Sequence, residues 1–154
     1  MQQYEHKVQY YETDKMAIVH HSNYIRWFES ARIDYLDKIG IDYVKLEAEG
    51  LVSPVLEVEC KYRNMVRFGD TVIVETRLSS YNGIKFSVEY VIKDKKTNKI
   101  KTTGSTSHCF LTNEGKPVSL KRSCKWADEL FSKALQADEK DAHKKESLRQ
   151  VKEQ

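Results

Sequence analysis

The 154-residue sequence has few of the residues that cross-link or interrupt a chain: three cysteines, two prolines and six glycines. The odd number of cysteines (Cys60, Cys109 and Cys124), without a C-x-x-C pair, argues against a disulfide framework and a zinc knuckle. No apolar run is long enough to span a membrane, and the N-terminal MQQYEHKVQYYETDK lacks the apolar core of a signal peptide. We therefore expect a cytoplasmic protein with reduced thiols and no membrane span.

An excess of charge of one sign is also missing. The 26 basic and 23 acidic residues leave a net charge of +3. A dedicated nucleic-acid binder carries a strong basic cluster, so we expect no nucleic-acid partner, although a local anion site fits this balance equally well. The length and the hydrophobic content of 40% are those of one globular domain with one core.

The first third of the chain predicts one strand and two helices. Alternating residues over 4–11 predict a strand whose buried face comprises Tyr4, His6, Val8 and Tyr10. An apolar stripe at spacings of three and four predicts an amphipathic helix, formed by Tyr24, Phe28, Ala31, Tyr35 and Ile39. Ser22 or Asn23 is its expected N-cap, and Gly40 stands just past its end. A shorter helix is expected over 42–49, capped by Asp42.

The middle of the chain predicts four long strands, over 56–63, 72–78, 84–92 and 100–111, each with one buried face. Asn82-Gly83 is a strong hairpin signal, and 113–117 has turn chemistry. Short connections favour antiparallel neighbours, so the predicted fold is α+β: about five antiparallel strands with one face covered by the central helix.

The C-terminal segment 123–154 differs in composition from the rest. Its apolar residues can dock one helix: Trp126, Leu130, Phe131 and Ala134. Beyond Gln136 the chain is almost entirely polar, which is typical of a solvated helix or a frayed tail. We assign this segment no function.

The stretch YYETDKMAIVHHSNYIRWFESAR, residues 10–32, concentrates ionisable groups where a strand runs into a helix. A helix start offers unpaired N–H groups and the positive end of a dipole, which stabilise an oxygen that becomes anionic. Asp14 in the preceding loop could act as base or nucleophile toward an acyl group held there. The alternative is that Asp14 only caps a turn.

Two adjacent histidines, His20 and His21, invite a metal or triad interpretation. Adjacent side chains usually diverge, and no His-x₃-His or Cys-x₂-Cys spacing is present, which argues against a metal site. A Ser-His-Asp triad from Ser22, His21 and Asp14 lacks the G-x-S-x-G elbow. A single histidine that binds substrate or positions the loop is the better hypothesis.

The motifs YYETD, IVHHSNY and RWFESAR resemble the hot-dog acyl-CoA thioesterases of the 4-hydroxybenzoyl-CoA thioesterase family, in particular the YbgC/FadM-like branch. EVECKYRNMVRFGDTVIVET and HCFLTNEGKPVSL are similar to later strands of that family. The resemblance covers roughly residues 4–122. It therefore implies a hot-dog domain over 1–122, followed by the C-terminal segment.

What the resemblance implies is specific. The sheet would curl around the helix over 24–39. Asp14 would attack an acyl-CoA thioester or activate a water, the Tyr24 N–H would bind the thioester oxygen, and His21 would orient the substrate. No metal or other cofactor is implied. The site would lie at a seam between subunits of a homodimer or of a homotetramer made of two dimers.

Other candidate residues have two interpretations. Lys61, Arg63, Arg67 and Lys85 could bind the phosphates of coenzyme A, or form a solvated face. Trp27 could line an acyl pocket or belong to the core.

Some positions depart from the family pattern or are best explained as structural. Glu29 and Arg32 are expected to form a structural ion pair. Glu12 stands where the family has an aspartate, and Ala17, where glycine is frequent, is expected to restrict the loop to negative φ.

The alternatives to an acyl-CoA thioesterase differ in substrate or in class. They are an acyl-carrier-protein thioesterase, a non-catalytic acyl-CoA-binding module and a hot-dog dehydratase. A dehydratase pairs a histidine with an acid for proton transfer, and its signature is absent here.

Overall fold

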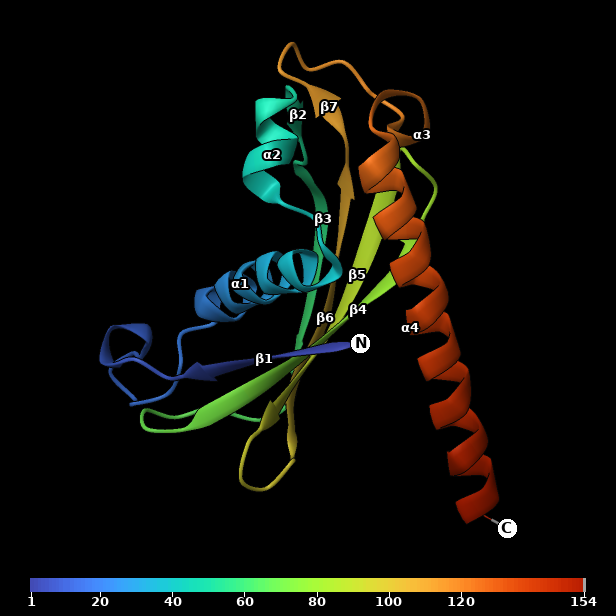
Figure 1. The fold of residues 1–154 in the computed structure, drawn as a ribbon. Helices are drawn as coiled ribbons and strands as arrows, with labels where there is room; N and C mark the ends of the chain where they lie inside the picture. Colours follow the sequence, from blue (N-terminus) through green and yellow to red (C-terminus); the bar gives the residue numbers. More distant parts are fainter. Residues whose placement is uncertain (154) are drawn as a thin grey trace.

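The computed structural model describes residues 1–153, in which an antiparallel sheet curls around a central helix (Figure 1). The elements are β1 (Gln2–Lys7), a 3₁₀ turn η1 (Tyr10–Glu12), α1 (Ser22–Ile39), α2 (Tyr43–Ala48), β2 (Leu51–Val52), β3 (Val55–Tyr62), β4 (Thr71–Tyr81), β5 (Lys85–Asp94), β6 (Ile100–Cys109), β7 (Leu111–Thr112), α3 (Leu120–Ser123) and α4 (Lys125–Lys152). The α+β prediction, with five strands around one helix, is confirmed.

The order of the five strands is β1-β4-β5-β6-β3, and β2 and β7 form a separate pair. The hairpin at Asn82-Gly83 joins β4 to β5 as predicted, with the Asn82 N–H donating to the Lys85 carbonyl. The expectation that consecutive strands are neighbours is wrong for β3, which pairs with β6 instead of β4. The connection over 63–70 is long enough to carry the chain from one edge of the sheet to the other side, which leaves β3 at an edge.

The core lies between α1 and the inner face of the sheet. Phe28 of α1 stacks on Tyr90 of β5, with ring centroids 4.4 Å apart. A Cβ atom on Gly104 of β6 would lie 2.5 Å from both the Glu59 carbonyl oxygen and a carbon of the Phe28 ring. Glycine is therefore what allows the helix to approach β6 this closely.

The start of α1 differs from the prediction. His21 is the N-cap, and neither Ser22 nor Asn23 caps the helix. The Ser22 N–H donates to His20 Nδ1 at 3.3 Å, while the Asn23 side-chain amide donates to the buried Glu12 carbonyl at 2.8 Å. Asn23 is thus used to tie the helix to the preceding segment.

The ends of the helices follow local signals more closely. Gly40 is the left-handed C-cap of α1, with φ of 96°, as predicted. Asp42 caps α2 by accepting from the Lys45 N–H at 3.1 Å, also as predicted. Both features depend only on residues within one turn of the helix end.

Two strand predictions are corrected. β1 ends at Lys7, and Tyr10, expected on the buried face, is exposed because the chain turns away through η1. β3 was expected to bury one face, but both of its faces are largely exposed, because it lies at the sheet edge. Its apolar residues Val55, Leu56 and Val58 are exposed in the single chain.

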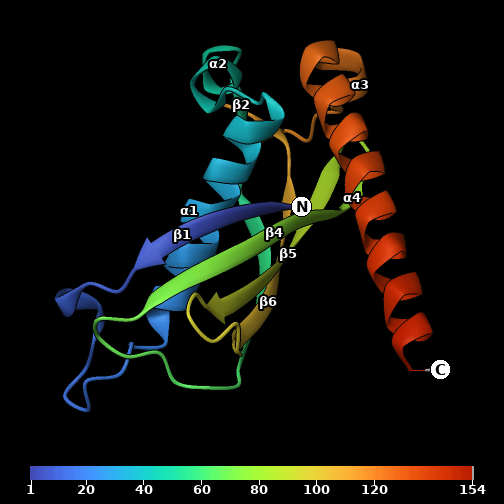
Figure 2. The same cartoon turned by 60° about the horizontal axis from the view of Figure 1, so that its bottom comes forward.

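The C-terminal segment forms one long helix, α4, which lies alongside the sheet (Figures 1 and 2) and packs against β4 and the C-terminal part of α1. Phe131 and Ala134 are buried, as expected for the docked part. Beyond Gln136 the helix continues, and Asp138 is buried: it accepts from the Tyr35 hydroxyl at 2.6 Å and the Leu78 N–H at 2.8 Å. One carboxylate therefore ties α4 to α1 and β4.

Candidate active site

Asp14 lies in a tight hairpin, the Asp14 loop (residues 13–19), between η1 and α1. Thr13 pairs with Val19 at its base, and the Asp14 N–H donates to the Ile18 carbonyl at 2.9 Å. One carboxylate oxygen of Asp14 accepts from the Met16 N–H at 2.8 Å. The backbone and one oxygen are thereby fixed, while the side chain stays exposed to solvent.

Ala17 in this loop has a φ of 59°, so the prediction that alanine keeps the loop at negative φ is wrong. The Ala17 N–H donates to the Asp14 carbonyl at 3.0 Å. This turn requires the left-handed conformation whichever residue occupies the position. The alanine side chain therefore carries backbone strain directly beside Asp14.

Glu12 is a buried anchor beneath the Asp14 loop. Its carboxylate accepts from the Gln9 N–H at 2.7 Å and the Trp27 indole N–H at 2.5 Å, and lies 2.7 Å from His6 Nε2. Its carbonyl accepts from the His20 N–H at 2.9 Å. Burial raises the pKa of Glu12, but the hydrogen bonds from Gln9, His6 and Trp27 together outweigh burial and hold the pKa below its usual value.

Glu12 therefore fixes both ends of the Asp14 loop and the first turns of α1. The sequence did not indicate this role, because an acidic residue next to a turn is expected to be solvated. Trp27 is also explained: it is 2% exposed and packs against His6, and it does not line the pocket around Asp14.

Asp14, His21 and Tyr24, the three residues predicted to be catalytic, line one pocket of about 280 Å³. The other lining residues are Ile18, Val19, Tyr62, Arg63, Asn64 and Met65. The structure thus brings a carboxylate, an imidazole and the start of a helix to one small volume. These are the components that polarise and attack an acyl group.

The start of α1 presents an unpaired donor. The Asn23 N–H donates to the His20 carbonyl at 3.0 Å, but within residues 1–153 the Tyr24 N–H has no hydrogen-bond acceptor. The Tyr24 side chain is buried, and burial raises its pKa. The Tyr24 N–H can therefore donate a hydrogen bond to an oxygen of a bound ligand, while the Tyr24 ring belongs to the core.

Tyr62 of β3 holds the helix start from the opposite wall of the pocket. Its hydroxyl donates to the His21 carbonyl at 3.1 Å, and its ring lies 5.2 Å from the Tyr24 ring. Burial, reinforced by a hydrogen bond with Cys60, raises the pKa of Tyr62 to about 12, so the hydroxyl remains a neutral donor. The strand pattern predicted its position on β3 but gave no sign of this contact.

The four candidate phosphate-binding cations lie in different places. Arg63 lines the pocket, and the backbone of Arg67 pairs with Ile18 of the Asp14 loop. Lys61 is paired with Glu59 on β3 at 3.2 Å. Lys85 is far from the pocket within one chain: it pairs with Cys109, seven residues along β6 from the partner of Tyr62, which is about 23 Å at the rise of a strand.

Comparison with known proteins identifies the family. The model of the Thioesterase-like superfamily matches residues 8–141. The chain belongs to this superfamily. A solved DHNA-CoA thioesterase from Staphylococcus aureus is 33% identical, with a TM-score of 0.84, over 91% of this chain and 93% of that one.

Two curated relatives also have names that refer to acyl-CoA thioesterase activity. YneP of Bacillus subtilis (strain 168), provisionally named an acyl-CoA thioesterase, is 32% identical over 77% of this chain and 86% of its own length. The acyl-CoA thioesterase YbgC of Haemophilus influenzae is 27% identical over 79% and 89%. The predicted resemblance, the hot-dog fold and the thioester hydrolase class are confirmed.

The ion pair expected between Glu29 and Arg32 is absent from the described residues of this thioesterase-like chain. Arg32 is buried instead, and donates to the Tyr90 hydroxyl at 3.2 Å. The Tyr90 hydroxyl lies 2.7 Å from the Thr106 hydroxyl, which lies 2.7 Å from His108 Nε2, so a chain of hydrogen bonds links Arg32 to His108. Burial, with a smaller effect from Arg32, lowers the pKa of His108 to about 3, so this histidine is neutral.

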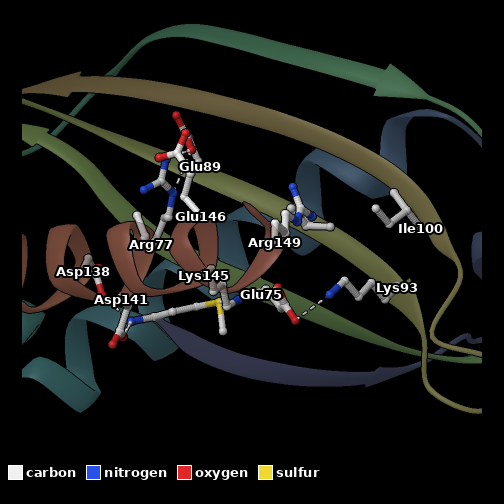
Figure 3. Close-up of a pocket in the computed structure, with 13 residues that line it drawn as sticks. Glu75, Arg77, Glu89, Lys93, Ile100, Asp138, Asp141, Lys145, Glu146 and Arg149 are labelled. Carbon is white, nitrogen blue, oxygen red and sulfur yellow. Dashed lines mark hydrogen bonds and ion pairs between the residues drawn. The ribbon is translucent and has the colours of Figure 1, made fainter. Parts of the chain in front are cut away.

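A second pocket of about 390 Å³ lies between α4 and strands β4 and β5 (Figure 3). Its charges are largely paired, as in Arg77–Glu89 at 2.5 Å and Lys93–Glu75 at 2.9 Å. None of the predicted site residues lines it. We therefore interpret it as the polar contact between α4 and the sheet, and not as the reaction site.

Neither a metal centre nor a membrane helix is apparent in the part of the chain that the structure describes. Residues 1–153 contain no group of three metal-ligating acidic, histidine or cysteine side chains. No helix within the same residues is long and apolar enough to cross a bilayer.

Proposed function

We propose that this protein hydrolyses acyl-CoA thioesters to a free carboxylic acid and coenzyme A in the cytoplasm. The observation that carries the proposal is the shared pocket of the Asp14 carboxylate and the unpaired Tyr24 N–H. Two relatives are named for acyl-CoA substrates, and a third, similar structure for DHNA-CoA, which supports coenzyme A as the carrier.

In the proposed reaction, Asp14 supplies the attacking group. Its carboxylate either adds to the thioester carbonyl, forming an anhydride that water then cleaves, or takes a proton from a water that adds instead. Either route turns the carbonyl oxygen into an oxyanion and ends with the release of the coenzyme A thiol. The Met16 N–H, which holds one oxygen of Asp14, keeps the carboxylate oriented for either step.

The proposed oxyanion donor is the Tyr24 N–H. It lies in the first turn of an 18-residue helix, where unpaired N–H groups and the helix dipole favour negative charge. His21, on the same pocket wall, hydrogen-bonds and orients the substrate. Tyr62 fixes the His21 main chain and so sets the position of both groups.

The proposed functional unit is a homodimer that pairs two copies of β3, with a dimer of dimers as the larger form. The free edge of β3 offers unpaired backbone groups, and Val55, Leu56 and Val58 are exposed apolar residues that a second chain would cover. Antiparallel pairing of the two edges would place the Val55 end of one strand near the Tyr62 end of the other. Each pocket would then lie at a seam between chains.

The test of the reaction is a thiol-release assay with acyl-CoAs of varied chain length and aromaticity. For Asp14→Asn we expect kcat to fall on the order of a hundredfold or more, with an unchanged melting temperature. Asp37→Asn, the same change at an exposed position late in α1, is the control and should be near wild type. Near-normal activity of Asp14→Asn would show the mechanism to be wrong, and no cleavage of any thioester would favour a binding module.

The proposed β3–β3 interface is tested by measuring the oligomeric mass of the protein in solution. Val58→Lys places a charge on the apolar edge and should yield monomers with little activity, whereas Glu57→Gln, on the same strand, should leave the dimer intact. A Val58→Lys protein that is still dimeric and fully active would contradict the proposed interface.

A further inference from the structure

Two aromatic side chains stand exposed near the Asp14 pocket and touch each other. Tyr10 is 79% exposed and Phe68 is 56% exposed, and their rings meet edge to face with centroids 5.7 Å apart. Single exposed apolar residues are ordinary on a soluble protein. The two ring planes are perpendicular, so a flat ligand that stacks on one ring meets the other ring at its edge.

Hydrogen-bonded turns fix the main chain that carries both rings. The Tyr10 carbonyl accepts from the Thr13 hydroxyl at 2.9 Å and from the Thr13 N–H at 3.2 Å, which closes the η1 turn. Phe68 lies in a second turn, closed by the Asp70 N–H to the Arg67 carbonyl at 3.1 Å and the Arg67 N–H to an Asp70 carboxylate oxygen at 2.9 Å. The main chain beneath the pair is therefore preorganised, and binding a ligand has only the two side chains left to order.

The pair lies within reach of the proposed reaction site. The Asp14 N–H is hydrogen-bonded to the Ile18 carbonyl, and Ile18 forms an antiparallel bridge with Arg67. Phe68 follows Arg67 directly in the sequence. Two cross-strand steps and one residue place the Phe68 backbone within roughly 15 Å of Asp14. The pantetheine arm of coenzyme A, about as long as four extended residues, covers roughly 14 Å between the thioester and the nucleotide.

Two exposed cations stand close to the pair, together with the Asp70 carboxylate of the Phe68 turn. Lys7 and Arg67 form no ion pair within residues 1–153. Lys7 lies beside the Phe68 turn, since Val8 donates to the Asp70 carbonyl. A ligand that combines a flat base with phosphates matches this combination of rings and free cations.

We propose that Tyr10 and Phe68 form a platform for the adenine base of coenzyme A, which stacks on one ring and meets the other at its edge, with Arg67 and Lys7 facing its phosphates. This subsite rests on the proposed acyl-CoA hydrolysis, and it gives a physical reason why coenzyme A would be the preferred carrier of the acyl group. A thioester of pantetheine or of an acyl carrier protein has no adenine and gains nothing from the platform. Loss of one base–aromatic stack corresponds to a roughly 5- to 150-fold loss of affinity, and the lower end is expected at this exposed site.

The test compares one acyl group on two carriers, coenzyme A and free pantetheine. For Tyr10→Ala and Phe68→Ala we expect KM for the acyl-CoA to rise about 5- to 10-fold with unchanged kcat, and KM for the acyl-pantetheine to stay constant. Tyr11→Ala is the matched control, because Tyr11 is 81% exposed on the same turn and has no aromatic partner in the described chain. Tyr10→Phe should restore wild-type KM.

The outcomes separate this inference from the function on which it rests. Unchanged KM values, or equal changes for both carriers, would overturn the platform while leaving the hydrolysis intact. A change in oligomeric mass of the alanine variants would also overturn it, by showing that the rings contact a second copy. If the wild type cleaves neither thioester, titration with adenosine 3′,5′-bisphosphate decides: weaker binding by Phe68→Ala sustains the platform, and equal or absent binding overturns it.

Discussion

Replacing Ala17 by glycine is expected to stabilise the protein, although most single substitutions destabilise. The left-handed conformation costs an L-residue roughly 1–2 kcal/mol, and glycine removes that cost. Glycine also increases the entropy of the unfolded chain, which costs about 0.4–1 kcal/mol. Ala17 is exposed, so removing its methyl group loses little burial. The balance is about 0.5–1 kcal/mol in favour of glycine, which raises the Tm of a chain of this size by about 1–4 °C.

The measurement is thermal and urea unfolding of Ala17→Gly beside Met16→Gly. Met16 is exposed in the same loop, and it is not among the residues of the described chain with positive φ. Glycine at Met16 therefore brings only the entropic cost, and its Tm should fall. If Ala17→Gly lowers the Tm as much as Met16→Gly, the strain assigned to Ala17 is not stored in the folded loop.

Three further predictions concern stability. Glu12→Gln removes a buried anion that three groups hydrogen-bond, and should cost about 1–3 kcal/mol in urea unfolding; because the folded pKa of Glu12 is lowered, the loss should shrink as the pH falls below 4.5. Gly104→Ala forces a methyl group against Phe28 and should cost about 1–3 kcal/mol or more, whereas Ser105→Ala on the same strand should be mild. His108 has a pKa of about 3 when folded and 6.5 ordinarily, so the unfolded chain binds the extra proton between these values. Stability should fall as the pH drops from 6.5 towards 3, and His108→Asn should flatten that part of the Tm profile.

Much of the fold could be predicted because its signals are local. The helical stripe, the glycine at its end and the Asn82-Gly83 turn each depend on a few neighbouring residues. The partner of β3 could not be predicted in this way. An alternating strand has the same pattern whether it pairs with β4 or β6, and only the packing around α1 decides between them.

The candidate site likewise has residues that could be predicted from local sequence and others that could not. Asp14, His21 and Tyr24 lie within eleven residues of one another in sequence, so a short loop brought them together as predicted. Lys85 is separated from the pocket by the length of a hairpin, which its charge could not reveal. The conformation of the Asp14 loop is set by bonds to its own carbonyl groups, and the residue types alone suggested the wrong φ for Ala17.

The exposed edge of β3 has a consequence for the chain before it is assembled. A free strand edge with apolar residues is a template for any other extended segment, so a newly made single chain is at risk of aggregation. Charged residues at Glu57, Glu59 and Lys61 limit that risk along the strand. If two chains complete each other there, the apparent stability will rise with protein concentration. Dilution would then separate the two chains under milder conditions than heating.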